Sequence, residues 1–499
     1  MGIHDLTISR FHAALRQGRT SIAATVSAYL TQITRHNPTL HALITVNPNA
    51  LSEAQKKDAA LDCRSAYTPL PRLHGVPIIL KDTYTTAGLR TTSGVRALET
   101  LQTATNAAVV DALLSQGAII LAKANVHEFC LQGVTASSIQ GQTLNPYDPT
   151  RTPGGSSGGT AAALAANMGL VGCGGDTMNS LRSPASACAI VGFRPTYGQV
   201  SRRGIVPVTE TQDVVGPMGR TVADVRVLFG VMRGEDRYDA ATVNPSRHRT
   251  PSPHKPRLRV GILRDYFGDA DTDDGAVVNS TIADALRRMR EQKISCKIEF
   301  TELPPLPEWD IPTLQATADM QAFEFREVFD AFLQSVEHTP HRSLASIVAS
   351  GLYHRDAVTP VLYQTLQDDG VFTTSSAEYQ SRLRRIEALK RSVENVFTKY
   401  DLDALVYPHQ RQLVAPVGSM VQPGRNGLLA ALTGRPAVCL PAGFSPPSPT
   451  APQGIPIGLE LMGQPWQDDE LLNLAEHFES VIQGRKAPVG YDPVPRTMS

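Results

Sequence analysis

Apolar residues recur at helical spacing near the start of the chain and then alternate with short apolar runs. Residues 7–34 follow the helical pattern. Further on, the apolar runs at 76–80 and 118–122 predict strands, and the segment 107–117 between them predicts a helix that ends at Gly117. This strand–helix–strand order favours a parallel or mixed sheet covered by helices.

The second half of the chain repeats this alternation. Residues 315–400 follow a mainly helical pattern. We expect strands at 258–263, 296–300, 404–408, 437–443 and 457–463, and helices at 276–292 and 468–483. Only the segment 243–257, rich in Pro, Ser and basic residues, has the composition of a loop or linker. Because the alternation resumes after it, we predict one large α/β unit with inserted helices.

Composition narrows the class of function. Hydrophobic residues make up 41% and charged residues 19% of the 499 residues, which is typical of a soluble globular enzyme. The 47 basic side chains equal the 47 acidic ones, so nothing favours nucleic acid or an anionic membrane as a partner, and a small neutral substrate is expected. No secretory signal and no apolar stretch of about 18 residues is present, which favours the cytoplasm.

Cysteine spacing argues against a metal or redox centre. The six cysteines are scattered and form no CxxC pair, so neither a zinc site nor a dithiol is indicated, and a reducing compartment fits. We therefore expect no metal and no cofactor. The cysteines are Cys63, Cys130, Cys173, Cys188, Cys296 and Cys439.

The most unusual segment is TPGGSSGGTAAALAANMGL at 152–170, where a glycine-rich loop leads into a helix of small residues. A phosphate loop would need a lysine that Gly158-Gly159-Thr160 lacks. Residues 155–159 match the GxSxG pattern of a nucleophile elbow, but the three prolines in NPYDPTRTP argue against the strand that must precede it. By itself, the segment is also consistent with a purely structural turn.

Two further segments change this interpretation. HGVPIILKDTYTTAG lies upstream at 74–88, and GCGGDTMNSLRSPASACAIVGFRPTYGQVSRRG lies downstream at 172–204. Together the three segments resemble the amidase signature family, with its GVPxxxKD, GGSSGG and DTxxSxRxPA motifs in order. Ser156 and Ser180 lie 24 residues apart, the separation of the two serines in that family. The resemblance covers at least residues 74–225, and a weaker similarity is present at 455–472.

The resemblance implies an α/β fold with a large mixed central sheet flanked by helices. It divides the single domain, 1–499, into successive parts. These are an N-terminal helical region (1–70), the catalytic signature core (71–240), the linker-like loop (243–257), a variable and mainly helical region with some strands (258–403), and C-terminal strands and a helix that return to the core (404–499).

The resemblance also implies a Ser–Ser–Lys triad that hydrolyses a carbon–nitrogen amide bond. Ser180 is the expected nucleophile, which forms an acyl-enzyme. Ser156 is the expected proton relay, because a hydroxyl both donates and accepts, and Ser157 is its positional alternative. Lys81 is the expected base, since burial favours the neutral amine that can accept a proton.

Backbone N–H groups just before the nucleophile are expected to stabilise the oxyanion. Here they belong to Thr177, Met178, Asn179 and Ser180 itself. Cys130 is expected to line the oxyanion side of the pocket, although a small buried residue with no chemical role fits there equally well.

The sequence departs from the family pattern before the nucleophile, where Met178-Asn179 replaces the usual Gly-Gly. Glycines allow a positive φ, which Asn tolerates and Met does not. Either the loop keeps its shape and the Met178 side chain narrows the pocket, or the oxyanion hole is distorted. We favour the first outcome because the rest of the motif is intact.

Residues around the motifs receive supporting roles. Asp176 and Arg182 are expected to pair and brace the nucleophile loop, although Arg182 could instead bind a substrate carboxylate. His127 and Glu128 are expected to be structural. The phenylalanines of 322–332 are expected to be mostly core residues.

Several functions share the expected triad. A free-standing amidase acting on a small-molecule amide, compatible with a homodimer, is the favoured interpretation. An A-type subunit of a glutamyl-tRNA amidotransferase fits less well, because the stretch 205–225 resembles free-standing amidases. An acyl transferase or esterase would use the same acyl-enzyme. A catalytically dead binding protein is suggested only by the altered pair at 178–179.

Overall fold

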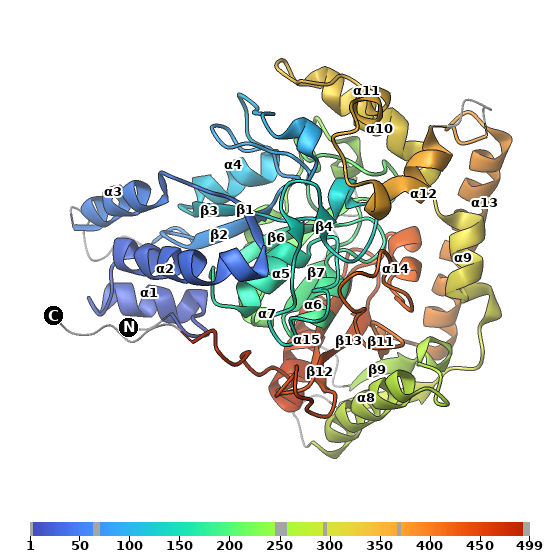
Figure 1. The fold of residues 1–499 in the computed structure, drawn as a ribbon. Coiled ribbons are helices and arrows are strands. Elements are labelled where there is room, and N and C mark those ends of the chain that lie inside the picture. The colour runs from blue at the N-terminus through green and yellow to red at the C-terminus, as the bar shows by residue number, and fades with distance from the viewer. Residues whose placement is uncertain (1–2, 63–69, 245–256, 293–296, 367–370, 493–499) are drawn as a thin grey trace.

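The computed structural model describes residues 3–62, 70–244, 257–292, 297–366 and 371–492 (Figure 1). Most of the predicted linker-like loop, residues 245–256, lies outside the described residues, as do Cys63 and Cys296. The partition into successive parts of one domain stays a prediction.

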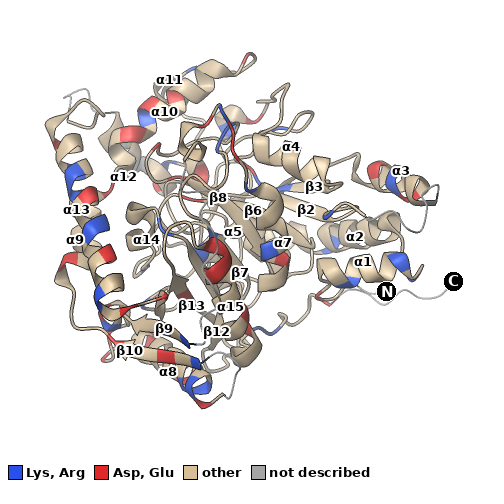
Figure 2. Ribbon diagram, turned by 180° about the vertical axis from the view of Figure 1, so that it is seen from behind, with Lys and Arg blue, Asp and Glu red and all other residues tan. Residues whose placement is uncertain are grey.

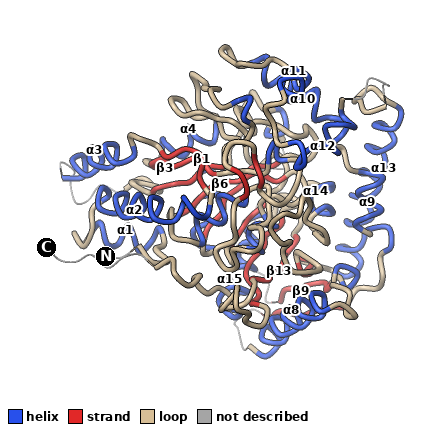
Figure 3. Tube along the Cα trace, viewed as in Figure 1, coloured by secondary structure: helices blue, strands red, loops and turns tan. Residues whose placement is uncertain are grey.

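Short and largely buried segments form one sheet of eleven strands through the middle of the molecule (Figure 3). The predicted strands in the C-terminal half are present with shifts of one or two residues. In spatial order the strands are β1 (Leu43–Val46), β3 (Ile119–Ala124), β2 (Pro77–Lys81), β6 (Val171–Asp176), β8 (Val214–Gly219), β7 (Val191–Arg194), β12 (Ala437–Phe444), β13 (Pro456–Met462), β11 (Ala404–Pro408), β9 (Arg257–Ile262) and β10 (Lys297–Glu302). A separate hairpin pairs β4 (Ala136–Ser137) with β5 (Gly141–Gln142).

The sheet is mixed, as predicted. Strands β3, β2 and β6 are parallel at one side, and β11, β9 and β10 are parallel at the other. Between these groups, from β6 through β8, β7, β12 and β13 to β11, neighbouring strands are antiparallel. The motif strand β2 therefore lies in a parallel group, with a neighbour on each edge, which accounts for its complete burial.

Helices surround this sheet (Figure 1). The region 315–400 is mainly helical, as its pattern predicts. The helices are α1 (Ile8–Arg16), α2 (Ile22–Leu40), α3 (Ala50–Asp62), α4 (Ala108–Ser115), α5 (Gly158–Ala165), α6 (Arg182–Ala187), α7 (Val222–Met232), α8 (Asp273–Glu291), α9 (Ile311–Ala318), α10 (Gln321–Ser335), α11 (Leu344–Ser350), α12 (Arg355–Thr365), α13 (Ala377–Tyr400), α14 (Leu428–Thr433) and α15 (Asp468–Ile482).

Helices α6 and α7 cover opposite faces of the sheet. A Cβ added to Gly192 of β7 would lie 2.8 Å from the Cβ of Ala185 in α6. The next residue, Phe193, instead has its ring 5.1 Å from that of Phe229 in α7. Since successive strand residues point to opposite faces, the two helices must lie on either side. The nucleophile loop, which leads directly into α6, therefore sits on the α6 side.

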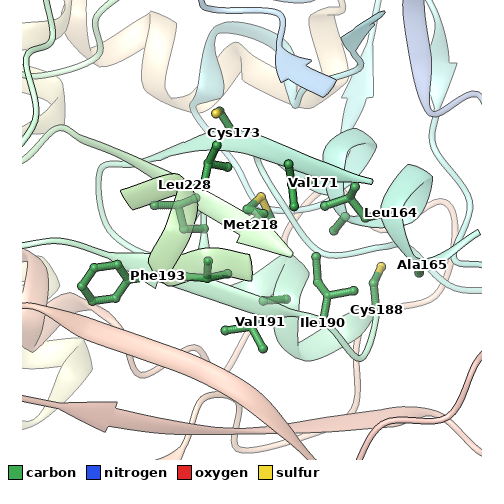
Figure 4. Packing of buried hydrophobic residues seen from close by; sticks show 14 of the residues in the cluster. Leu164, Ala165, Val171, Cys173, Cys188, Ile190, Val191, Phe193, Met218 and Leu228 are labelled. Carbon is green, nitrogen blue, oxygen red and sulfur yellow. The ribbon is translucent and has the colours of Figure 1, made fainter. Parts of the chain in front are cut away.

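The core between these layers is continuous and apolar. Figure 4 shows side chains from strands and helices meeting there, and all of those named here are fully buried. They come from α5 (Leu164), β6 (Val171 and Cys173), β7 (Val191 and Phe193), β8 (Met218) and α7 (Leu228).

Charged side chains of both signs lie side by side on the outer helices, for example along α13 (Figure 2). This mixture matches the balanced charge of the chain. Among the described residues, no helix is long and apolar enough to cross a membrane.

Helix α5 is buried along its whole length because its small residues allow close approach. A Cβ on Gly159 would lie 2.3 Å from the carbonyl oxygen of Asn125 and 2.5 Å from that of Ala42. Backbone oxygens cannot give way as a flexible side chain can. Gly159 is therefore required by the approach of two neighbouring chain segments to the helix.

We predict that Gly159→Ala lowers the free energy of unfolding by about 2 kcal/mol or more, because the added methyl group must displace backbone. Urea denaturation monitored by circular dichroism measures this. Gly234→Ala is the matched control, since a Cβ there meets nothing within 4 Å, and it should change stability by less than about 0.5 kcal/mol. Equal stability of both variants would contradict the packing argument.

Candidate active site

Two of the expected catalytic side chains are in direct contact. Lys81 is the last residue of β2, and its Nζ donates a hydrogen bond to Ser156 Oγ over 2.8 Å. Lys81 is 2% exposed and Ser156 is fully buried, so little water competes for this contact. The segment upstream and the glycine-rich loop therefore meet in space as their order in the sequence suggested.

A second buried lysine beside this pair has a different environment. Lys123 of the neighbouring strand β3 lies 3.0 Å from the carboxylate of Asp82, which compensates its charge. Within the described ranges, no carboxylate forms an ion pair with Lys81. The two lysines thus differ in their partners: Lys123 faces a carboxylate, and Lys81 faces a serine hydroxyl.

The glycine-rich loop is shaped by contacts with Thr135. The Thr135 hydroxyl donates to Gly154 O over 2.7 Å and accepts from Gly158 N over 3.1 Å. The Gly155–Ser156 peptide is cis. Among the described residues, no strand lies between β5 and α5. This is not the strand–turn–helix geometry of a nucleophile elbow.

Ser157, the positional alternative to Ser156, is bound to backbone. Its hydroxyl donates to Gly175 O over 3.2 Å and accepts from Gly175 N over 3.3 Å. Its backbone N donates to Ser180 O over 3.3 Å, which ties the glycine-rich loop to the nucleophile loop. Ser157 thus positions the two loops, and Ser156 alone of the pair reaches Lys81.

The nucleophile loop is held by polar contacts rather than by glycine geometry. Neither Met178 nor Asn179 has a positive φ. Asn179 Oδ1 accepts from Gly427 N over 2.9 Å, and Thr177 Oγ1 donates to Asp213 over 2.6 Å. Met178 packs partly buried against the α9, α13 and α14 core. The loop is formed without the backbone strain that the missing Gly-Gly pair would suggest.

Asp176 and Arg182 lie in contact on either side of this loop. Arg182 Nε and Nη2 donate to the Asp176 carboxylate over 3.0 Å each, and Arg194 Nη1 donates to it over 3.0 Å. Burial alone would raise the pKa of Asp176, but the two guanidinium charges outweigh it and hold the pKa below its usual range. The carboxylate is therefore charged at neutral pH.

Arg182 is fully buried, and each nitrogen of its guanidinium donates to a protein group. Besides Asp176, it donates to the backbone oxygens of Met178 and Gly427 over 2.7 and 3.0 Å and pairs with Glu460 of β13. The alternative in which Arg182 binds a substrate carboxylate does not fit these contacts.

The sequence motifs did not predict the buried residues around Glu460, which complete this cluster. Glu460 also accepts hydrogen bonds from the Tyr407 hydroxyl and from His409, and all three are fully buried. Burial would raise the pKa of Glu460, but the charge of Arg182 outweighs it and lowers the pKa. Burial lowers the pKa of His409. A glutamate inside the apolar run IGLELMG was the signal that could have identified this network.

Cys130 and Lys81 line one hollow next to the loop. This hollow has a volume of about 550 Å³ and also contacts Thr177. Cys130 lies in a short 3-10 turn, η2 (Glu128–Cys130), with a φ of 63°. Its place beside Lys81 is consistent with pocket lining.

His127 and Glu128 make structural contacts, in line with the expectation. His127 Nε2 lies 3.1 Å from Ala357 O, and burial lowers its pKa to about 3. The Glu128 carboxylate accepts hydrogen bonds from the backbone N of Ser138 and of His354 over 2.6 and 2.7 Å. Both side chains therefore join separate loops. Among the described residues, no cluster of three or more potential metal ligands occurs.

The mixed sheet and the contact between a buried lysine and a serine of the glycine-rich loop agree with the resemblance to amidases that the sequence motifs gave. The sequence profile of the amidase family matches residues 24–472. The chain belongs to the amidase signature family and is an enzyme that hydrolyses carbon–nitrogen amide bonds.

Individual relatives include both amidotransferase components and amidases. The chain is 31% identical to the A-type subunit of the glutamyl-tRNA(Gln) amidotransferase of Chloroflexus aurantiacus, over 96% of this chain and 97% of that protein. Among solved structures, it is similar to the peptide amidase of Stenotrophomonas maltophilia, with a TM-score of 0.79, 28% identity and coverage of 97% and 98%. An amidase family protein of Bacillus anthracis gives a TM-score of 0.80 at 26% identity, with coverage of 97% and 92%.

We predict that Asp176→Asn lowers the free energy of unfolding at pH 7 by about 3 kcal/mol, because it removes the carboxylate that Arg194 pairs with and leaves Arg182 with Glu460 alone. The folded-state pKa is lowered, so this contribution is present above pH about 4 and is lost as pH falls through the folded-state value. Denaturant titrations at pH 7 measure the loss. Asp284→Asn, which breaks an exposed pair with Arg287, is the control and should change little. Equal effects would contradict the role of the cluster.

Proposed function

We propose that the protein is an amidase for a small-molecule amide, with Ser180 as nucleophile, Ser156 as proton relay and Lys81 as base. The observation that carries this proposal is the buried hydrogen bond between Lys81 and Ser156. It couples an amine to the serine that lies 24 residues before Ser180.

The environment of Lys81 supports a base. Lys81 is nearly buried beside Ser156, and the described part of the chain supplies no carboxylate to pair with it, in contrast to Lys123. A neutral amine can accept the Ser156 proton, while the Ser156 hydroxyl accepts the proton of Ser180. The Ser180 oxygen then attacks the amide carbon.

The backbone around Ser180 supports an oxyanion site. The N–H groups of residues 177–180 donate to no described residue, whereas those of Leu181, Arg182 and Ser183 all find acceptors inside the loop. Unpaired N–H groups at a nearly buried position are costly unless a ligand satisfies them. They would stabilise the negative oxygen that forms when Ser180 adds to the carbonyl.

Collapse of the tetrahedral intermediate, which forms when Ser180 adds to the amide carbonyl, breaks the carbon–nitrogen bond. The proton held by Lys81 returns through Ser156 to the leaving nitrogen, which departs as a neutral amine or as ammonia. Water then attacks the acyl-enzyme by the same proton route and releases the carboxylic acid and free Ser180. An alcohol or amine in place of water would make the protein an acyl transferase.

A second candidate is the A-type component of an amidotransferase, favoured by the names of the curated relatives at about 30% identity. Such a component would release ammonia from glutamine and would need a companion protein. The purified chain alone, assayed for ammonia release from glutamine and from simple primary amides, separates the two. Turnover of simple amides without a partner supports the free-standing amidase, which we expect to be located in the cytoplasm.

We predict that a fluorophosphonate probe labels Ser180, as located by peptide mass spectrometry. Ser180→Ala should abolish the labelling, and Lys81→Ala should reduce its rate by at least about 100-fold, because the proton acceptor is lost. Ser157→Ala serves as the matched neighbour and should retain labelling.

Each result has a clear meaning. Labelling at Ser157 would overturn the triad. Absence of labelling in folded protein would favour a binding protein with a disabled loop. Loss of labelling in Lys81→Ala with an unchanged melting temperature would separate a chemical role from a structural one.

A further inference from the structure

A second hollow lies on the other side of the nucleophile loop. It has a volume of about 330 Å³ and is enclosed by the loop, by α9 and by the segment that precedes α14. We call it the Arg425 hollow. Its walls include Met178, Asn179, Gln315, Arg411, Arg425 and Leu428.

The Arg425 hollow carries positive charge without a compensating acid. Arg411 and Arg425 line it, and none of its described lining residues is Asp or Glu. A larger neighbouring hollow, of about 560 Å³, shares Met178, Gln315 and Arg425 with it. A group bound between the loop and Arg425 would therefore meet a local positive potential, although the chain as a whole is neutral.

Arg425 differs from the other arginines around the loop in having no side-chain partner among the described residues. Arg182 and Arg194 share the Asp176 carboxylate, and Arg411 Nε donates to Asn426. No hydrogen bond or ion pair joins the Arg425 guanidinium to any residue that the structure describes. Burial lowers the pKa of Arg425 to about 10 against the opposing effect of Asp176, so the group is still charged at neutral pH.

The chain leaves room for this guanidinium beside the catalytic loops. A Cβ on Gly133 would lie 2.2 Å from Arg425 Nη1, so any larger residue at 133 would displace it. Gly133 in turn lies against the glycine-rich loop, since a Cβ on Gly155 would be 2.9 Å from the Gly133 carbonyl carbon. Gly133 thus lies between the Arg425 guanidinium and the glycine-rich loop that carries Ser156. Arg425 also lines the same hollow as Met178, two residues before Ser180.

A guanidinium presents its donors in a planar fork that matches a carboxylate. A partly buried cation without a partner destabilises the free protein, and an anionic ligand would offset this cost. The size of the Arg425 hollow suits a short carboxylate-bearing group, and its glutamine side chains offer further hydrogen bonds.

We propose that Arg425 binds a carboxylate of the substrate, so that the enzyme selects amides that carry a negative charge close to the scissile bond. This inference rests on the proposed function and deepens it. It replaces the neutral substrate expected from the overall charge with an anionic one. The carboxylate belongs either to the acyl group, as in a monoamide of a short dicarboxylic acid, or to the leaving amine, as in an N-acyl amino acid.

Matched substrates test this. Succinamic acid and butyramide differ in the acyl-side carboxylate, and N-acetylglycine and N-ethylacetamide differ in the amine-side one. In the wild-type protein we expect kcat/KM to favour the anionic member of one pair by about 10- to 100-fold. Arg425→Gln should remove that preference and retain turnover of the neutral member. Arg425→Lys should keep part of it, because the charge remains but the fork is lost.

The controls separate specificity from folding and from the proposed function. Arg287→Gln, a surface change on α8, should keep the wild-type preference. If Arg425→Gln lowers turnover of both members equally, or of neither, the inference is overturned.

If the wild-type protein hydrolyses neither pair and Ser180 does not label, the proposed function fails, and calorimetric titration with succinate still tests the anion site. Binding to wild type that Arg425→Gln abolishes supports the site, and absence of binding to wild type overturns it.

Discussion

Arg182 connects the parts of the active site that come from distant regions of the chain. It reaches the Asp176 carboxylate at the end of β6, two backbone oxygens beside the nucleophile loop, and Glu460 in β13. Because Arg194 also pairs with Asp176, two buried guanidinium groups balance two buried carboxylates, and that compensation is what makes burial of ions tolerable. The loop that carries Ser180 takes its shape from this cluster, which explains why it needs no glycines at 178 and 179.

The two faces of the loop meet different surroundings. On one side, Thr177 borders a hollow that reaches Lys81 and Cys130. On the other side, Met178 and Asn179 border the Arg425 hollow. The proposed proton transfer thus lies on the side built from the signature motifs, and the proposed charge selection lies on the side built from α9 and the segment before α14.

Strands with apolar side chains and site residues inside known motifs could be predicted from the sequence, whereas glycine-rich strands and isolated polar residues could not. Strands such as β2, β3 and β11 are apolar runs in the sequence and were predicted, because burial on both faces of the sheet favours apolar residues. Strand β6, whose sequence is VGCGGD, was not expected, since its glycines leave no hydrophobic pattern; close neighbours require Gly172 and Gly174. Lys81, Ser156 and Asp176 were identified through motifs. Arg425 lies in a PGRNG stretch that is typical of an exposed turn, and only the fold places it beside the loop.

The separation of Arg182 and Glu460 by 278 positions has a consequence for synthesis of the chain. During translation, the nucleophile segment leaves the ribosome long before β13 exists, and until then Arg182 lacks one of its two acidic partners. The nascent polypeptide therefore carries Ser180 in an unassembled loop, and the buried cluster that braces this loop forms only when β13 takes its place between β12 and β11.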